Sequence, residues 1–302
     1  MRRSREQKRS IRNGLLFVSP WIVGFLVFIA YPVCSSVYYS FTDYNGLNEG
    51  SWVGLANYKE LFTEDPLYMT AVGNTLYYVL FSLLIGQTAA LALALLLNRG
   101  LREIALYRVL YYIPSVLPGV AVTFLWIFLM DAQYGMVNGV IAALGGEGPG
   151  WMIDPQWAKL SLVLLAVWTG GQGTIIYLSG LGNIPKVLYE SAEIDGASPW
   201  RRLTGITLPL ISPQILLSVI LGTIGGFKVF TSGFISGGSL GNPQNSTLFY
   251  STYIYHQAFK LFHMGYASAM AWILAIATLL AVLVTFRLSR KKVHYMQDGG
   301  IA

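Results

Sequence analysis

Six long runs of apolar residues constrain the fold of this 302-residue chain more than any other feature. A helix needs about 20 apolar residues to cross the hydrocarbon core of a bilayer, which is roughly 30 Å thick. Runs of this length lie at residues 14–36, 72–97, 109–130, 158–180, 209–231 and 264–288. Inside lipid the backbone must satisfy its own hydrogen bonds, so each run is predicted to be helical. The predicted fold class is all-α: a polytopic membrane protein with six transmembrane helices.

Charged residues are scarce, and their positions follow the apolar runs. They make up 11% of the chain, whereas about 25% is typical of soluble proteins. The net charge of +6 comes from arginines and lysines gathered before the first run, after the second, between the fourth and fifth, and after the sixth. Because cytoplasmic loops carry the excess of Lys and Arg, both termini are predicted to be cytoplasmic. A nucleic-acid-binding surface would not follow this alternation, so no nucleic-acid partner is predicted.

The sequence contains no pattern typical of a catalytic or metal site. Cys34 is the only cysteine, so no disulfide framework is predicted. His256, His263 and His294 are not spaced as metal ligands. No Walker lysine motif occurs, so the chain is predicted to hydrolyse no ATP itself and to bind no cofactor.

The most specific motif is a polar stretch between the fourth and fifth apolar runs. It reads Glu190-Ser191-Ala192, then Gly196, then Ile206-Thr207-Leu208-Pro209. A short amphipathic helix is predicted to end in a left-handed turn at Gly196. Ser198 and Pro199 are predicted to cap and open a second helix. Pro209 is predicted to open the fifth span, where its missing N–H costs nothing.

This stretch resembles the EAA loop of permease subunits of ABC importers. The family pattern is Glu-Ala-Ala, three residues, Gly, nine residues and Ile-x-Leu-Pro; both spacings are kept, and Ser191 stands where the family has alanine. The resemblance implies a type I ABC importer permease fold in a bacterial cell membrane, with the loop at 182–208 contacting a separate ATPase. It assigns ATPase coupling to Glu190, Ser191, Ala192, Asp195, Gly196, Ile206, Leu208 and Pro209.

Other motifs are similar to the branch of this family that imports maltose-type sugars or glycerol phosphate. They include Phe41-Thr42-Asp43-Tyr44, Gly73-Asn74-Thr75 and Asp154-Pro155. The resemblance implies import of a carbohydrate, and of an oligosaccharide in particular, delivered by an extracytoplasmic solute-binding protein. It also implies a second, homologous permease subunit and an ABC ATPase dimer that uses ATP and Mg.

Three alternatives remain open at this point. Import of glycerol-3-phosphate by the same fold would favour cations in the pocket, and Lys228 is the only strong cation inside a span. A secondary transporter would usually contain inverted repeats or intramembrane acids, and neither is found. A membrane-embedded enzyme would need an intramembrane catalytic set, which is missing.

A substrate pathway is expected across spans three, four and five. By resemblance to the maltose importer, the sugar-contacting positions are Ser115, Gly119, Ala166, Thr169, Gly170, Gly173, Gly222, Gly225 and Gly226. The nearby Trp168, Gln172, Tyr177, Phe227 and Lys228 are predicted to supply aromatic faces and hydrogen bonds, although Lys228 also fits a side chain that reaches to the outer interface. Because nearly all the first positions are small, they indicate either a wide cavity for a long oligosaccharide or close helix packing.

The predicted organisation is a basic cytoplasmic N-terminus at 1–13, a transmembrane permease domain at 14–288 and a cytoplasmic tail at 289–302. The first outer connection is acidic, through Asp43, Glu49, Glu60, Glu64 and Asp65. Both a solvated face and contact with a partner are consistent with this acidity. The second outer connection contains a glycine cluster, 145–150, that is predicted to form a flexible loop.

Overall fold

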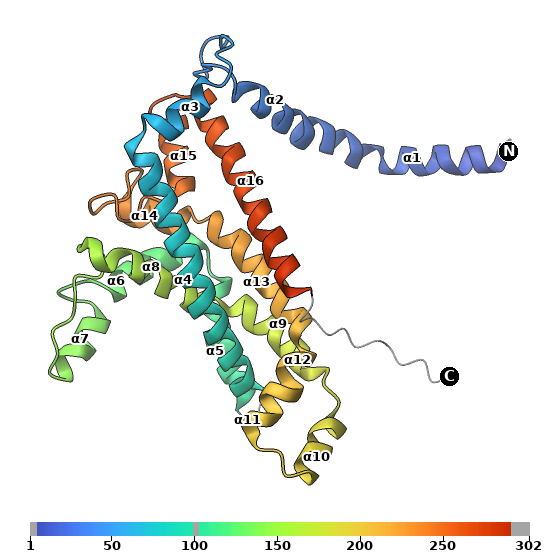
Figure 1. Cartoon of the computed structure of the whole chain (residues 1–302), viewed down its shortest axis with the longest axis vertical. Helices are drawn as coiled ribbons and strands as arrows, with labels where there is room; N and C mark the ends of the chain where they lie inside the picture. Colours follow the sequence, from blue (N-terminus) through green and yellow to red (C-terminus); the bar gives the residue numbers. More distant parts are fainter. Residues whose placement is uncertain (1–4, 99–102, 291–302) are drawn as a thin grey trace. The chain divides into compact units, whose positions relative to one another are not determined.

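The computed structural model describes residues 5–98 and 103–290, and these residues are helical apart from connections and one bridge between Thr42 and Trp52 (Figure 1). The α-helices are α1 (Arg5–Phe25), α2 (Tyr31–Tyr39), α3 (Ala56–Thr63), α4 (Pro66–Leu97), α5 (Ile104–Val116), α6 (Gly119–Leu129), α7 (Met136–Ala143), α8 (Pro155–Trp168), α9 (Gly171–Gly182), α10 (Lys186–Ile194), α11 (Pro199–Arg202), α12 (Leu208–Leu210), α13 (Ser212–Phe227), α14 (Thr231–Gly237), α15 (Tyr250–Phe259) and α16 (Met264–Ser289). Two π-helical turns, η1 (Leu26–Ala30) and η2 (Leu203–Thr207), continue neighbouring helices. The all-α prediction is confirmed; His294 and most of the predicted tail lie outside the described residues.

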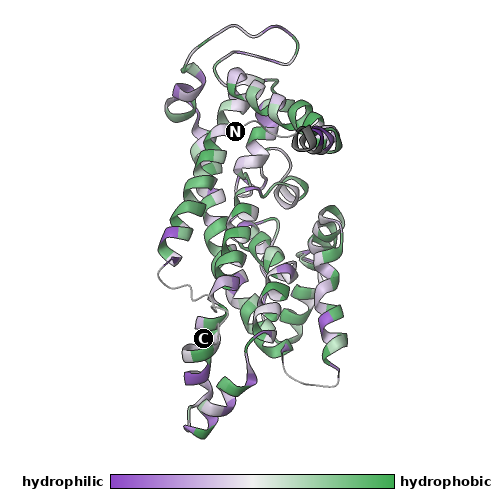
Figure 2. Ribbon diagram, turned by 90° about the vertical axis from the view of Figure 1, so that its right-hand side faces the viewer, coloured by the Kyte–Doolittle hydropathy of each residue, from purple (hydrophilic) through white to green (hydrophobic). Residues whose placement is uncertain are grey.

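Four helical segments are individually long and apolar enough to cross a membrane. They are Arg12–Tyr39, Pro66–Leu97, Ser212–Gly237 and Met264–Ser289. Two further spans form only if bent pairs are counted as one each: α5 with α6, bent by 105°, and α8 with α9, bent by 40°. The described chain therefore has four to six candidate spans, and all six predicted runs coincide with them. Most of these helices are coloured as hydrophobic in Figure 2.

The third predicted span, 109–130, is not a single continuous helix. Its helix is interrupted at Leu117, whose backbone is extended with ψ of 148°. Pro118 follows and serves as the N-cap of α6. A residue before proline is disfavoured in the helical region, and proline cannot donate the next helical hydrogen bond. The sequence therefore produces a sharp bend between α5 and α6.

Helix starts in this chain repeatedly use a capping side chain followed by proline. Asp65 accepts hydrogen bonds from the backbone N–H groups of Leu67 and Tyr68, at 2.9 and 3.1 Å, and Pro66 opens α4. Asp154 and Pro155 open α8 in the same way. The side chain satisfies N–H groups that have no helical partner, and the proline ring is already in a helical φ. These local signals fix where α4 and α8 begin.

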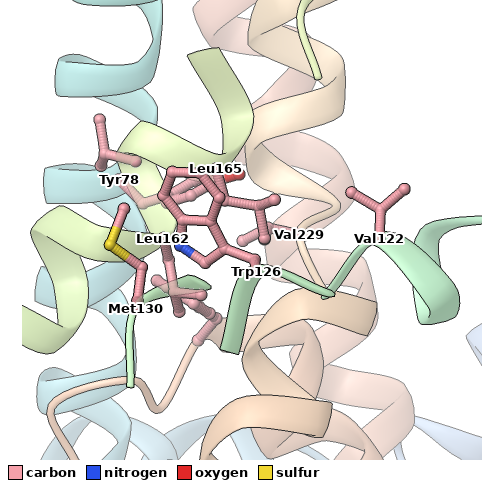
Figure 3. Packing of buried hydrophobic residues seen from close by; sticks show 9 residues of the cluster. Tyr78, Val122, Trp126, Met130, Leu162, Leu165 and Val229 are labelled. Carbon is pink, nitrogen blue, oxygen red and sulfur yellow. The ribbon is translucent and has the colours of Figure 1, made fainter. Parts of the chain in front are cut away.

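The core of the larger unit forms where α4 packs against α8, α9 and α13. One cluster of buried side chains surrounds Trp126, which lies close to Leu162, Leu165 and Val229 (Figure 3). Helices in lipid gain little from the hydrophobic effect, so van der Waals contacts and hydrogen bonds hold them together. Trp126 Nε1 supplies one such bond by donating to Ser161 Oγ at 3.1 Å.

The described residues divide into two compact units. The first combines the chain up to Glu64 with Gln257–Ile273, and the second combines Asp65–His256 with the chain from Leu274 onward. Within the first unit, Trp272 Nε1 donates to Ser36 Oγ at 3.2 Å. The most apolar window of its first helical segment has no buried residue. Both regions predicted to be functional lie in the second unit.

The glycine cluster in the second outer connection forms a loop, as predicted, and the side chain of Asn138 holds it against α7. Asn138 of α7 donates to the carbonyl oxygens of Ala132 and Pro149, both at 3.1 Å. Its Oδ1 accepts from Trp151 Nε1 at 2.7 Å. One buried amide thus fixes both ends of the connection. Sequence reading missed it because the three contacts lie six to thirteen residues away.

Candidate functional site

Two adjoining cavities lie among the helices that were expected to line a substrate pathway. Their volumes are about 380 and 270 Å³, and they share Tyr78, Ala166, Thr169 and Gly225. Hydroxyl and amide groups come from Tyr78, Ser82, Gln87, Ser115, Thr123, Thr169, Gln172, Ser218, Thr231 and Ser232. The other lining residues are glycine, alanine, proline, aliphatic side chains and Phe230. Among the described residues, the lining of these two cavities includes no charged side chain.

Ten of the fourteen residues predicted for the substrate pathway line these cavities. They are Ser115, Gly119, Ala166, Thr169, Gly170, Gln172, Gly173, Gly222, Gly225 and Gly226. The bends of the two broken spans bring them together. The break between α5 and α6 presents Ser115 and Gly119, and the break between α8 and α9 presents Thr169 and Gly170.

The other four predicted residues lie elsewhere. Trp168 packs on Trp126, with ring centroids 5.4 Å apart. Tyr177 and Phe227 are buried between helices. Lys228 is exposed at the C-terminal end of α13, outside both cavity linings. A lysine near the end of a span can extend its side chain to water. This costs less free energy than holding the charged group inside the membrane.

Gln87 is the polar residue of the cavity that sequence reading missed. Its Oε1 accepts hydrogen bonds from Tyr177 Oη at 2.5 Å and from Ser218 Oγ at 2.9 Å. Its Nε2 donates to the carbonyl oxygen of Ser218 at 3.2 Å. The amide therefore joins α4, α9 and α13 while also lining the smaller cavity. An amide in the middle of the largely apolar run 72–97 was the available signal, because polar groups at membrane depth are costly.

The cavity glycines fall into two groups according to what a β-carbon would meet. At Gly225 nothing lies within 4 Å, and at Gly119 the nearest atom is a methyl carbon of Thr231 at 3.8 Å. At Gly222 a β-carbon would lie 2.8 Å from Leu83 and 2.9 Å from Gln87 Nε2, and at Gly226 it would lie 3.1 Å from Val79. The first pair leaves open space, whereas the second pair permits close helix packing. The small residues therefore indicate a wide cavity at Gly119 and Gly225, and close helix packing at Gly222 and Gly226.

The cytoplasmic loop folds as its local sequence predicts. Helix α10 ends at Ile194 with Asp195 as its C-cap, and Gly196 follows with a φ of +71°. The N–H of Ala197 donates to Ala192 O at 2.9 Å and that of Gly196 to Glu193 O at 3.1 Å, which is the Schellman pattern of helix endings. Ser198 Oγ then accepts from the N–H of Arg201, so α11 begins with the predicted cap and proline.

Pro209 does not open the fifth span, contrary to the prediction. It lies in α12, which continues from α11 through η2, and the span begins at Ser212. A proline in the first turn of a short helical segment still loses no hydrogen bond. Ile206 and Leu208 pack against a buried cluster that includes Tyr177 and Ile211. The second half of the motif therefore lies against the transmembrane core.

The first half of the motif forms the exposed surface of the loop. Glu190, Ser191, Asp195 and Gly196 are exposed, and Ala192 is half-buried. Ile194 and Trp200 are 87% and 72% exposed, which is unusual for large apolar side chains in a polar loop. Sequence reading did not select these two residues, although apolar side chains within a polar cytoplasmic stretch were a visible signal.

One hydrogen bond links the exposed half of the loop to the buried half. Tyr189 of α10 and Thr207 of η2 pair their hydroxyl oxygens at 2.8 Å. Tyr189 also packs against the buried cluster at the base of α4 and α9. A force applied to α10 therefore has a direct contact path into the transmembrane helices. In Figure 1, α10 and α11 lie at one end of the second unit, beyond α12.

Comparison with known families identifies the chain. Residues 82–291 match the family described as "Binding-protein-dependent transport system inner membrane component". The chain belongs to this family. The permease is therefore a multi-pass inner-membrane component of an ABC importer that works with a binding protein, and its ATPase is a separate subunit. Membership in this family also excludes the two alternatives of a secondary transporter and a membrane-embedded enzyme.

Individual relatives cover almost the whole permease. "Probable ABC transporter permease protein YesP" of Bacillus subtilis (strain 168) is 38% identical over 98% of this chain and 96% of its own length. The lactose transport system permease protein LacF of Rhizobium radiobacter is 33% identical over 93% and 95%. The crystal structure of a bacterial alginate ABC transporter, in complex with a periplasmic protein that holds an alginate pentasaccharide, contains a chain with a TM-score of 0.82 and 25% identity. That match covers 97% of this permease and all of the other chain.

Proposed function

We propose that this permease imports an uncharged oligosaccharide delivered by an extracytoplasmic solute-binding protein. The observation that carries the proposal is the lining of the two cavities, which offers hydroxyl, amide and small groups without a charged side chain. The relatives that import lactose, and the transporter solved with alginate pentasaccharide, support carbohydrate as the substrate class.

Sugar chemistry fits this lining. Hydroxyl and amide groups both donate and accept hydrogen bonds, as sugar hydroxyls do. Tyr78 and Phe230 add aromatic faces for the C–H surface of a pyranose ring. The open positions at Gly119 and Gly225 give room along the pathway. An extended chain of sugar units matches two adjoining cavities better than a single small solute does.

Glycerol-3-phosphate is the weaker candidate. A phosphate group is recognised by arginine, lysine or clustered backbone N–H groups. Lys228 was the only cation that sequence reading offered for this purpose, and it lies outside both cavity linings. Uptake assays with cells that carry or lack the importer separate the two substrates. We expect the importer to raise uptake of neutral oligosaccharides and to leave uptake of glycerol-3-phosphate unchanged; the opposite result would exclude the proposal.

We further propose that the loop at 182–208 transmits ATPase closure to the membrane helices. In this mechanism a second, homologous permease completes the pore, and an ABC ATPase dimer contacts one loop from each permease. Ile194 and Trp200 supply exposed apolar contacts, while the Tyr189–Thr207 bond carries motion to η2 and the fifth span. Rigid-body movement of packed helices is the expected response.

The segment assignment follows from the same scheme. Residues 1–13 form the cytoplasmic N-terminal segment, 14–288 the transmembrane domain and 289–302 the cytoplasmic tail. Helix α1 begins at Arg5, so the first boundary falls within a continuous helix. A helix that emerges from lipid into water needs no break at the interface.

A pull-down tests the coupling role. Detergent-solubilised wild-type permease is expected to recover an ATPase and a second permease. Glu190→Lys and Gly196→Pro should lose the ATPase and retain the second permease, because both changes alter the exposed half of the loop. Glu60→Lys, on an exposed outer glutamate, is the matched control and should behave as wild type. Equal ATPase recovery by all four proteins would contradict the proposal.

A further inference from the structure

A third cavity lies in the first unit, in the outer connection that follows α2. Its volume is about 500 Å³, and its lining includes Tyr38, Tyr39, Tyr44, Asn48 and Glu49. Aromatic rings therefore form much of its wall, and one amide, one carboxylate, Leu47 and Gly50 complete it. The charge alternation along the chain places this connection on the side of the membrane opposite the EAA loop.

The aromatic wall joins the end of α2 to the loop after it. The rings of Tyr39 and Tyr44 stack with centroids 4.3 Å apart and an angle of 15°. Tyr38 is 54% exposed and lies 5.9 Å from the ring of Trp52. Trp52 in turn stacks on Phe41 at 5.3 Å. A continuous aromatic surface thus faces outward beside the cavity.

The loop that closes the cavity is held by its own hydrogen bonds. Asp43 Oδ1 accepts from the N–H of Ser51 at 2.5 Å, and the N–H of Asp43 donates to Ser51 O at 3.1 Å. Asn45 Oδ1 accepts from the N–H groups of Leu47 and Asn48, both at 3.0 Å. Binding to a loop that is already ordered loses less conformational entropy.

The start of α16 anchors the same loop within this unit. The N–H of Gly265 donates to Tyr44 O at 2.8 Å. A β-carbon at Gly265 would lie 2.0 Å from Thr42 O, so only glycine permits this approach. Tyr44 is therefore held by two contacts: the hydrogen bond from Gly265 to its backbone and the stacking of its ring on Tyr39.

The chemistry of this cavity fits an uncharged saccharide. The C–H face of a sugar ring packs against an aromatic ring, while its hydroxyls bond to carboxylate, amide and phenol groups. Glu49 accepts hydrogen bonds, and Asn48 and the tyrosines both donate and accept them. Asp43 and Glu49 bring negative charge to the loop, which disfavours uronates and sugar phosphates.

We propose that this cavity is an outer saccharide-binding site at which the permease contacts its substrate before the substrate enters the transmembrane pathway. The proposal rests on the carbohydrate import proposed above and adds a second site to it. A permease with this site holds sugar near the entrance after release from the binding protein. The effective concentration of sugar at the transmembrane pathway then rises, although the transmembrane site itself binds the sugar no more tightly.

Saturation-transfer NMR on the complete importer in nanodiscs, without binding protein, tests the site. The probes are lactose and short gluco-, galacto-, xylo-, manno- and arabino-oligosaccharides, with oligogalacturonate as the charged comparison. We expect saturation of C–H protons in at least one neutral probe and none in oligogalacturonate. Tyr44→Ala should weaken binding of that probe by about tenfold or more, which corresponds to roughly 1.4 kcal/mol.

Conservative and control variants separate binding from folding. Tyr44→Phe keeps the ring and should keep most of the signal, whereas Glu49→Gln should weaken it several-fold. Tyr134 is 90% exposed on another outer connection, so Tyr134→Ala is the matched control for loss of an exposed tyrosine. Glu60→Gln is the matched control for loss of an outer carboxylate. Both controls should bind the probe as wild type does.

Three results would overturn the proposal, and they are distinguishable. An unchanged signal in Tyr44→Ala and Glu49→Gln would assign any bound sugar to the transmembrane cavities. Weaker docking of the sugar-free binding protein, with an unchanged NMR signal, would make this surface a protein-docking site. If the importer transports one of the probes but no bound probe is detected, the outer site is excluded and the proposed carbohydrate import is unaffected. If no neutral probe is transported and glycerol-3-phosphate is, the proposed function itself fails.

Discussion

Tyr177 Oη donates a hydrogen bond to Gln87 Oε1 at 2.5 Å, and this bond joins α9 to α4 beside the smaller transmembrane cavity. Ser218 of α13 donates to the same oxygen at 2.9 Å. One amide therefore holds three helices that the proposed cycle must move together. Because Gln87 also lines the cavity, its amide is placed to contact a substrate there.

Loss of this amide should cost more stability than loss of either hydroxyl. Tyr177→Phe removes one of two donors to Gln87 and should cost about 0.6 kcal/mol, the average for such bonds between membrane helices. Gln87→Leu leaves two hydroxyls without their acceptor and should cost about 1–3 kcal/mol. Unfolding of the solubilised permease measures both effects. Thr88→Val is the control, because exposed Thr88 bonds only to Leu84 O, at 2.7 Å; equal costs for all three variants would contradict the network.

Two adjacent glycines should respond differently to the same substitution. Gly225→Leu places its side chain in open cavity space, so uptake should fall, and long oligosaccharides should be lost before short ones. Gly226→Leu meets Val79 within 3.1 Å and should lower stability by about 1–3 kcal/mol through overpacking. Uptake by sugar length and thermal unfolding provide the two measurements. Similar destabilisation by both variants would show that Gly225 also serves helix packing.

The Tyr189–Thr207 bond should affect coupling more than assembly. Tyr189→Phe and Thr207→Val each remove it, and a bond of this kind contributes about 0.5–1.5 kcal/mol. Stimulation of ATP hydrolysis by the loaded binding protein should fall several-fold, while the ATPase still co-purifies. Thr88→Val is the control, since Thr88 is exposed outside the loop and its hydroxyl bonds to Leu84 O within α4. Full stimulation in both variants would rule out this contact path.

The ion pair between Glu193 and Arg202 should contribute little to stability. The charged atoms lie 3.6 Å apart, and the side chains are 72% and 25% exposed. Solvent screening limits such pairs to a few tenths of a kcal/mol. A double-mutant cycle with Glu193→Gln and Arg202→Gln should therefore give a coupling energy below about 0.5 kcal/mol. A coupling above about 1 kcal/mol would mean that the loop is more buried than its structure indicates.

Asp131, in the outer connection after α6, should make stability depend on acid pH. Hydrogen bonds from the N–H groups of Tyr134 and Gln133 lower the pKa of its carboxyl below the ordinary 3.8. A lowered folded-state pKa stabilises the protein above the unfolded value, and that stabilisation is lost as pH falls through the folded value. The difference in unfolding temperature between wild type and Asp131→Asn should therefore shrink below pH 3.8. A difference that stays constant with pH would exclude this role.

Local rules account for what could be predicted from the sequence. Apolar length predicted where the spans lie, and the alternation of basic residues predicted their orientation. The turn at Gly196 and the cap at Ser198 were predicted because each needs only neighbouring residues. Motif resemblance also selected nine of the residues that line the cavities.

The failures involve contacts between distant segments. Gln87 was missed because its partners lie 90 and 131 residues away. Lys228 was considered for the pathway because it is a cation inside a predicted span, and its sequence position does not say which way its side chain faces. Pro114 and Pro118 disturb the helix locally, but the 105° bend between α5 and α6 exceeds what their local chemistry specifies.

The sequence by itself determined that this chain is a helical membrane protein, because hydrophobic length, charge bias and helix capping are properties of short segments. Its EAA motif is also a short segment, and the resemblance of that motif indicated a permease. Only the tertiary structure decided which small residues open a cavity and which permit close packing. The same holds for the amide that joins three helices and for the tyrosines that wall the outer cavity. These features arise when side chains from separate helices and loops compete for the same space, and no short segment contains that information.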